Sequence, residues 1–336
     1  MKVDGRLEMN MKKTEAQAKA YEALGYSGLW SFEVTHDPFL PLAIASQGTT
    51  RVDLGTSIAV AFSRSPMTVA QAAHDIQAAS DGRMCLGLGS QIKPHIEKRF
   101  SMQWSHPAKR MREFIAAMRA IWACWDDGAK LDFRGDFYQH TLMTPNFMPS
   151  PNPAGPPKVF LAGVGELMTQ VAGELADGFI CHGFTTDRYI REVTLPALVE
   201  GRRRAGKTMD GFEVMVPASI ATGENDEQLE RSIASARQSV SFYGSTPAYY
   251  PVFELHGWND LGPELNALSK QGRWDDMKVA IPDEVLNAFT VVAEPEAIAG
   301  EIARRYGDSV QRLSFSMPDG GDPERWRSVI SSLRSI

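Results

Sequence analysis

The sequence predicts an α/β fold, a closed (β/α)8 TIM barrel with a helical insertion before the last strand. Residues 51–60 (RVDLGTSIAV) and 83–91 (RMCLGLGSQ) each run through apolar residues to Gly and Ser, and a helical pattern at 66–80 separates them. Short loops around that helix favour parallel strands that are buried on both faces. The same alternation continues to eight strands, which favours a closed barrel over an open sheet.

The individual elements follow from hydrophobic spacing and from the positions of glycine and proline. We expect Thr14 to cap a helix that Gly25 ends, and Phe133 and Tyr138 to belong to a short hairpin. The predicted strands cover residues 3–8, 27–33, 51–60, 82–88, 158–162, 178–182, 212–221 and 311–316, and the predicted helices cover residues 14–24, 66–80, 108–125, 166–176, 187–205 and 295–306.

The chain is expected to form one domain over residues 1–336, because this length suits one large barrel with insertions. Residues 238–293 form the predicted helical insertion. It contains the phrase FYGSTPAYYPVFELHGW, which is too apolar and aromatic for a linker. We expect this phrase to pack over the strand ends or to form a subunit contact.

The composition is that of an ordinary globular protein, with 43% hydrophobic and 23% charged residues. A net charge of −6 and a pI near 5.7 argue against nucleic acid or an acidic membrane as the main partner. The amino-terminal residues lack the apolar run of a signal peptide. Cys85, Cys124 and Cys181 are expected as buried hydrophobic residues, which is consistent with a cytoplasmic protein.

Two glycine-rich turns follow predicted strands, but neither matches the dinucleotide-binding fingerprint. Gly87-Leu88-Gly89 and Gly163-Val164-Gly165 both lack the third glycine of the fingerprint. For the second turn, the acid expected about 20 residues later is also missing, because that position falls near His182 and Asp177 precedes the strand instead of ending it. The second turn opens a helix whose first N–H groups would suit a phosphate. A plain strand-to-helix turn explains the same residues equally well.

His36 is the candidate catalytic residue, because it follows the second predicted strand within the sequence EVTHDPF. An imidazole at that edge can donate a hydrogen bond to a cofactor or act as a general acid or base near neutral pH. The alternative is a histidine that only stabilises the turn before Pro38. His182 ends the sixth predicted strand and allows the same two interpretations. Arg64 and Lys93 follow strand ends and either bind an anion or are simply solvated.

Other chemistries have no support in the sequence. No CxxC, HExxH or close cluster of His and Asp indicates a metal site. A GxSxG nucleophile turn and a GxxxxGK[ST] phosphate loop are also absent.

Several short motifs together resemble the bacterial luciferase-like superfamily. Within it the chain is most similar to oxidoreductases that use the deazaflavin coenzyme F420, especially a mycobacterial-type subgroup that carries the aromatic phrase of residues 238–293. The motifs are residues 51–58 (RVDLGTSI), Ser65-Pro66, Ala70-Gln71, residues 80–83 (SDGR), Gly87-Leu88-Gly89, residues 162–165 (AGVG) and residues 176–179 (ADGF).

The resemblance implies a cofactor ring across the carboxyl ends of the barrel strands. It places a non-prolyl cis peptide at Ser57–Ile58 behind the ring, and His36 at its reactive edge. Relatives that oxidise sugar phosphates carry a Glu near the position of Ile92, so this chain is not expected to use that substrate class. The implied cofactor-binding residues are His36, Ser57, Ile58, Ala59, Gly89, Ser90 and Gln91, with Ala162, Gly163, Val164, Gly165 and Glu166 as the phosphate-binding turn, and His182.

The resemblance therefore implies hydride transfer between F420 and an organic small-molecule substrate, with His36 as proton donor or acceptor. Deazaflavin does not productively activate oxygen, which favours reduction or dehydrogenation. An FMN-dependent monooxygenase is the nearest alternative, and a non-catalytic protein that binds flavin or deazaflavin is the second. We also expect a homodimer.

Overall fold

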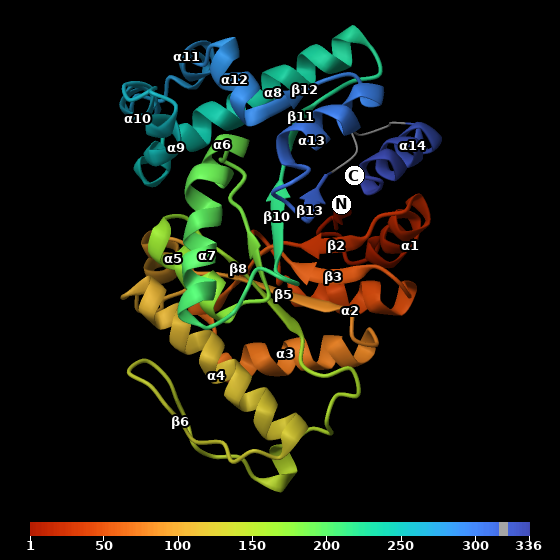
Figure 1. Cartoon of the computed structure of the whole chain (residues 1–336), viewed down its shortest axis with the longest axis vertical. Helices are drawn as coiled ribbons and strands as arrows, with labels where there is room; N and C mark the ends of the chain where they lie inside the picture. The colour runs from red at the N-terminus through yellow and green to blue at the C-terminus, as the bar shows by residue number, and fades with distance from the viewer. Residues whose placement is uncertain (316–321) are drawn as a thin grey trace. The chain divides into compact units, whose positions relative to one another are not determined.

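The computed structural model describes residues 1–315 and 322–336, and the chain divides into two compact units. The amino-terminal unit comprises Gly5–Ile180 and Ala197–Glu213. The carboxyl-terminal unit comprises Met1–Asp4, Cys181–Pro196 and Val214–Ile336. Figure 1 labels the helices and strands of both.

Parallel strands alternate with helices throughout the amino-terminal unit. Pairing runs β2–β3–β5–β8–β9, with β4 also beside β5. Figure 1 shows helices around the outside of these strands, with α3 next to α4. The strands are β2 (Gly28–Ser31), β3 (Asp53–Thr56), β4 (Ala59–Val60), β5 (Met84–Gly89), β8 (Lys158–Ala162) and β9 (Gly178–Ile180), and the helices are α1 (Thr14–Leu24), α2 (Phe39–Gly48), α3 (Pro66–Ala79), α4 (Pro107–Asp127), α5 (Glu166–Leu175) and α7 (Leu195–Arg204), whose first two residues lie in the other unit.

Close contact between β3 and β5 requires glycine at position 87. A Cβ atom there would lie 1.9 Å from the carbonyl oxygen of Thr56. The Thr56 hydroxyl donates to the Gly87 carbonyl and accepts from the Gly87 N–H, at 2.7 and 3.0 Å. Every residue of β5 is buried, as expected for a central strand covered on both faces.

The predicted strand 51–60 is divided into β3 and β4 by a cis peptide bond between Ser57 and Ile58. The resemblance places a non-prolyl cis bond at this position, and the structure confirms it. The prediction of one continuous strand is wrong because the chain leaves the β3 ladder at Ser57 and pairs with β5 again only at Ala59.

The carboxyl-terminal unit joins the two ends of the chain. Lys2–Asp4, from β1 (Lys2–Arg6), pair in parallel with β13 (Arg312–Ser314), which also pairs with β10 (Glu213–Pro217). A separate small sheet joins β11 (Ser219–Ala221) to β12 (Thr290–Val292). The predicted strand 212–221 is therefore two strands, and only β10 belongs to the main sheet.

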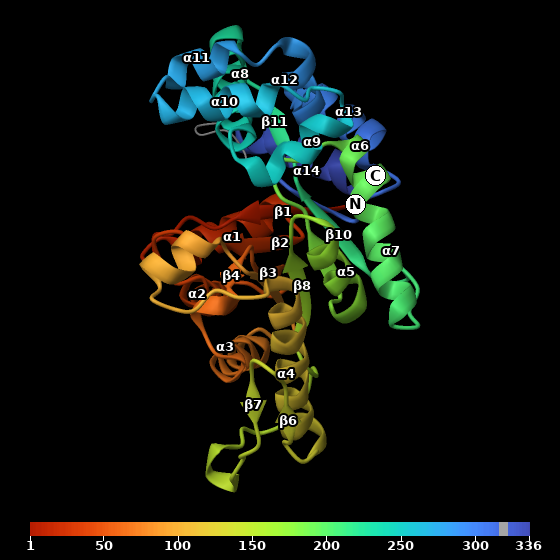
Figure 2. The same ribbon diagram turned by 90° about the vertical axis from the view of Figure 1, so that its left-hand side faces the viewer.

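The predicted insertion, residues 238–293, lies within this unit and is mainly helical, but its residues Thr290–Val292 form β12. Figure 2 shows α8, α10, α11 and α12 gathered into one group. Val252 and Phe253 of the aromatic phrase are buried in a hydrophobic cluster with Phe184 and Phe289. Much of the phrase therefore packs inside its own unit. The helices of the unit are α6 (Asp187–Tyr189), α8 (Asp226–Gly244), α9 (Tyr250–Leu255), α10 (Leu261–Lys270), α11 (Trp274–Val279), α12 (Asp283–Phe289), α13 (Ile298–Tyr306) and α14 (Pro323–Arg334).

Several local expectations are confirmed and one cap is wrong. Gly25 ends α1 in the left-handed conformation at φ 99°, as predicted. The N-cap is Lys13 rather than Thr14, whose hydroxyl instead donates to the Asn10 carbonyl. The predicted hairpin forms between β6 (Phe133–Arg134) and β7 (Gln139–His140). All three cysteines are buried, and no disulfide joins them.

Hydrophobic spacing misses α2, α14 and the first part of α8, whose residues 226–237 precede the predicted insertion. The sequence of α2, FLPLAIASQG, is apolar on all sides and contains a proline, so it lacks an amphipathic period. Ser316, the last residue of the predicted eighth strand, lies outside the described residues. Short helical turns complete the chain at η1 (Ala61–Ser63), η2 (His95–Arg99), η3 (Pro145–Phe147), η4 (Ile190–Thr194), η5 (Pro247–Tyr249) and η6 (Pro295–Ala297).

Candidate functional site

The pairing of the strands places the carboxyl ends of β4, β5, β8 and β9 side by side, and four of the predicted ligand-binding segments lie at these ends. Val60 of β4 pairs with Gly89 of β5. Leu88 pairs with Leu161, so Gly89 and Ala162 follow at the same height. Ala162 in turn pairs with Ile180. The carboxyl ends of β4, β5, β8 and β9 therefore form a continuous row in the amino-terminal unit, which is where parallel α/β folds bind ligands.

Ser57, Ile58 and Gly89 are adjacent within this row. A Cβ atom on Gly89 would lie 2.8 Å from Cδ1 of Ile58, so glycine leaves room for that side chain. The Ser57 N–H donates to the Ser31 carbonyl at 2.6 Å, which ties the segment to β2. Ser57 and Ile58 are half-buried, whereas Ala59 is fully buried. These positions offer a surface of backbone and small side chains against which a flat ring can lie.

Ser90 and Gln91 form a tight turn directly after β5. Gln91 has a left-handed backbone, with φ at 60°. Its side-chain oxygen accepts the N–H of Ile92 at 3.0 Å, and the Ser90 hydroxyl donates to the Gln91 carbonyl at 3.1 Å. Both side chains are half-buried, and these local hydrogen bonds hold the turn beside Gly89.

The turn at residues 162–166 opens helix α5. Gly165 is the N-cap at φ 80°, and no described side chain caps this helix. Its first N–H groups thus lack a side-chain acceptor, which is the arrangement that suits a phosphate. Val164 and Glu166 are exposed. The Glu166 carboxylate accepts from Gln170 Nε2 at 2.7 Å and carries a negative charge at the same helix end, which opposes anion binding.

His36 is exposed in the loop after β2, and no described residue hydrogen-bonds to its ring. The imidazole is thus accessible to a ligand. Its loop is held through the neighbouring Asp37, whose Oδ1 accepts the N–H of Phe39 at 2.8 Å.

An ion-pair network that the sequence did not reveal connects the His36 loop to β4. Arg64 donates to Glu33 at 2.6 Å and to Asp37 at 3.0 Å. Glu33, whose side chain is only 5% exposed, also accepts the N–H of Val60 at 2.8 Å. Arg64 therefore forms ion pairs with two carboxylates of the chain. The sequence analysis instead expected it to bind an anionic ligand or to be solvated. The acids that flank His36 were the only local signal for this network.

His182 lies in the carboxyl-terminal unit, two residues beyond β9. Its Nδ1 accepts the N–H of Phe184 at 3.0 Å, and its Nε2 lies 3.1 Å from the hydroxyl of Tyr249. The Tyr249 ring stacks on the imidazole with centroids 4.4 Å apart. Burial lowers the pKa of His182 to about 4, so the ring is neutral at physiological pH. Both ring nitrogens thus have partners within the chain.

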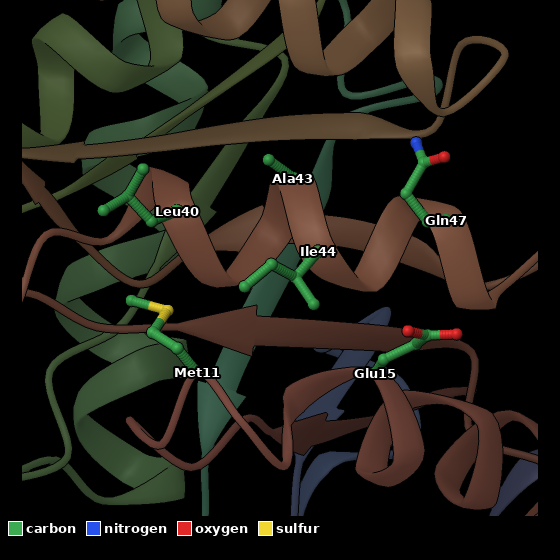
Figure 3. Close-up of a pocket in the computed structure, with 6 residues that line it drawn as sticks. All are labelled: Met11, Glu15, Leu40, Ala43, Ile44 and Gln47. Atoms are coloured by element: carbon green, nitrogen blue, oxygen red, sulfur yellow. The ribbon is translucent and has the colours of Figure 1, made fainter.

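A separate open hollow lies between α1 and α2. Figure 3 shows side chains from α2 facing Met11 and Glu15. The hollow has a volume of about 520 Å³, and none of the predicted site residues lines it. Its lining residues are Met11, Glu15, Leu40, Ala43, Ile44 and Gln47. It is a feature of the outer helices and not of the strand ends.

Among the described residues, no helix is long and apolar enough to cross a membrane. The same part of the chain holds no group of three or more His, Cys, Asp or Glu residues that could bind a metal ion.

Comparison with known proteins shows the family to which the chain belongs. The family model for luciferase-like monooxygenases matches residues 3–312. An uncharacterized protein of Mycobacterium tuberculosis, Rv1360, is 50% identical over 93% of this chain and 92% of its own length. The 5,10-methylenetetrahydromethanopterin reductase of Archaeoglobus fulgidus is 25% identical over 95% of this chain and 93% of its own.

Solved structures show the fold. The coenzyme F420-dependent tetrahydromethanopterin reductase from Methanopyrus kandleri superimposes with a TM-score of 0.79 at 17% identity, and the match covers 98% of this chain and 96% of that one. The chain thus has the predicted α/β fold, a closed barrel of eight parallel strands.

Proposed function

The chain belongs to the luciferase-like monooxygenase family of flavin- and deazaflavin-dependent oxidoreductases, and we propose that it is an F420-dependent oxidoreductase acting on a small organic substrate. The observation that carries the proposal is the continuous row of strand ends in which Ile58 lies against Gly89, next to the uncapped start of α5. This row offers a flat surface for a ring and free N–H groups for its phosphate.

F420, when bound, would supply the hydride chemistry, and the protein residues would supply binding and orientation. Ser57, Ile58 and Ala59 would support one face of the ring, with Gly89, Ser90 and Gln91 beside it. The turn at residues 162–166 would hold the phosphate. Arg64, through Glu33 and Asp37, would keep the His36 loop in place.

His36 is the proposed proton donor or acceptor for the substrate. Its ring is exposed and free of described partners, so both nitrogens remain available to a ligand. An imidazole can donate or accept a proton, so it can serve in either direction of a hydride transfer.

Deazaflavin dependence rests on the relatives. The reductase from Methanopyrus kandleri uses F420, and its structure covers nearly the whole chain. The match to the monooxygenase family model leaves FMN as the competing cofactor.

The cofactor is tested by titrating the purified protein with F420 and with FMN while following the fluorescence of its seven tryptophans. We expect F420 to bind more tightly. Tighter binding of FMN would instead support the monooxygenase alternative. Binding of F420 without turnover of any compound in a metabolite library would support a non-catalytic cofactor-binding protein.

A further inference from the structure

The outer face of α2 is exposed, although this helix has no polar side. Its sequence, FLPLAIASQG, contains no Asp, Glu, Lys or Arg, whereas every other α-helix of the amino-terminal unit contains at least one. The outer face consists of Leu40, Ala43, Ile44 and Gln47, at the spacing of one helical stripe. The Leu40 side chain is 57% exposed. A helix that is apolar all round is normally covered on every side, so this face indicates an interaction surface.

The hollow between α1 and α2 gives this face a shape that another apolar surface can fill. It has a volume of about 520 Å³, and the four α2 residues line it together with Met11 and Glu15 (Figure 3). Glu15 is the only charged residue of the lining, and its carboxylate is already paired with Lys19 at 2.6 Å. The hollow is therefore nearly neutral, as the centres of protein interfaces are.

The face is large enough for a stable contact when the neighbouring helices are included. In Figure 2, α2 lies between α1 and α3, and it contacts both. These helices are about 15–21 Å long, and packed helices lie about 10 Å apart. Their outer faces together project to roughly 500 Å², to which the relief of the side chains adds. Stable interfaces bury about 800 Å² on each partner, which is of the same order.

The charge and shape of this face suit a second copy of the chain. A symmetric contact brings the same side chains together near its twofold axis, so charges there would repel each other. The α2 face has none, and Asp75 is the only Asp, Glu, Lys or Arg residue of α3. The face also contains a ridge, formed by Leu40 and Ile44 one helical turn apart, beside the hollow that serves as a groove. Two copies can therefore interlock ridge into groove.

We propose that the chain forms a symmetric homodimer through the outer faces of α1, α2 and α3, in which the ridge of Leu40 and Ile44 in each copy packs into the hollow of its partner. Removal of these apolar side chains from water supplies the driving force. The contact uses only residues of the amino-terminal unit and does not depend on which cofactor binds.

Sedimentation velocity of the wild type and of Leu40→Arg at the same micromolar concentration tests the proposal. The wild type is expected to sediment as a species of twice the chain mass of 37.1 kDa. Leu40→Arg is expected to raise the dimer dissociation constant roughly 100-fold or more, because like charges would face each other in the contact. Ala43→Arg, on the same face, is expected to act in the same way. Arginine is favourable in helices and both positions are exposed, so these variants should keep their fold.

Leu142→Arg is the matched control, because Leu142 is 77% exposed in the same unit and lies in the loop after β7. This variant is expected to remain dimeric. A monomeric wild type, folded α2 variants that stay dimeric, or equal dissociation of Leu142→Arg would overturn the proposal.

A thiol label provides a second measurement that leaves the contact intact. The three native cysteines are buried, so Ala43→Cys supplies an exposed thiol. Its reaction with a maleimide dye should be largely lost above the dimer dissociation constant and should return on dilution below it. Leu142→Cys should react equally at both concentrations. Equal reaction of Ala43→Cys at the two concentrations would contradict burial of α2 in the dimer.

Discussion

His36 has an exposed side chain on a loop that hydrogen bonds hold in place, so a single substitution can test its role in catalysis. His36→Ala is expected to lower kcat by roughly 100-fold or more, the usual contribution of a general acid or base. The dissociation constant for F420 should change little. His95→Ala, another exposed histidine, is the control. Turnover would be measured with a substrate found by library screening, and an unchanged kcat would remove His36 from the mechanism.

His182 gives the protein a pH-dependent stability. A histidine in the unfolded chain titrates near pH 6.5, whereas burial lowers the pKa of folded His182 to about 4. Between these values the unfolded chain binds more protons, so the free energy of unfolding decreases as pH falls from about 6.5 toward 4.

His182→Asn removes this titration while its amide oxygen can still accept the Phe184 N–H. Between pH 7 and pH 5 the wild type should lose about 1 kcal/mol more stability than the variant, after allowance for the partial exposure of the ring. Urea unfolding at the two pH values measures the difference. Equal losses would show that His182 is not held neutral by the fold.

At the scale of an element, the start of α5 contains two opposing features. Its free N–H groups favour an anion, whereas the Glu166 carboxylate repels one. Glu166→Gln is therefore expected to tighten F420 binding by roughly twofold to fivefold, with a larger effect at low salt.

The control for that change is a deazaflavin without the phosphate, whose affinity should not respond to Glu166→Gln. A second control is Glu230→Gln, which neutralises an exposed carboxylate on α8. If Glu166→Gln affects both cofactors equally, the turn at residues 162–166 does not bind the phosphate.

At the scale of the whole molecule, an ion pair joins the first strand to the last. Arg312 donates to the two carboxylate oxygens of Asp4 at 2.7 and 2.9 Å, and both side chains are fully buried. Arg312→Met would leave the buried Asp4 carboxylate without this partner, which is expected to cost about 3–5 kcal/mol of stability.

Urea unfolding of matched variants tests that expectation. Asp4→Leu combined with Arg312→Met should recover most of the loss, because an apolar pair leaves no buried charge. Arg325→Met is the control, because Arg325 pairs with the exposed Glu296 and its loss should cost far less stability. Similar losses for Arg312→Met and Arg325→Met would contradict the role of burial.

The expected homodimer stays a prediction, which sedimentation velocity would test.

Much of the fold could be predicted because it depends on local pattern. The spacing of apolar residues predicts α3 and α4 almost to their ends, and Lys158–Ala162 forms a strand with the predicted bounds. Glycine at strand ends indicates the ligand edge. The close contact with the Thr56 carbonyl requires glycine at position 87, and Gly89 leaves room for the Ile58 side chain. The spacing of apolar residues did not predict α2, because this helix is apolar on all sides and has no polar face.

The sequence by itself determined the alternation of strands and helices, the glycine-rich strand ends and the position of His36 after a strand, since each follows from the order of neighbouring residues. Only the tertiary structure decided which side chains are partners. Arg64 reaches carboxylates 27 and 31 residues away, and Tyr249 reaches His182 across 67 residues. The physical reason is that a side-chain hydrogen bond depends on distance and direction in space, which the chain acquires only when its strands and helices pack.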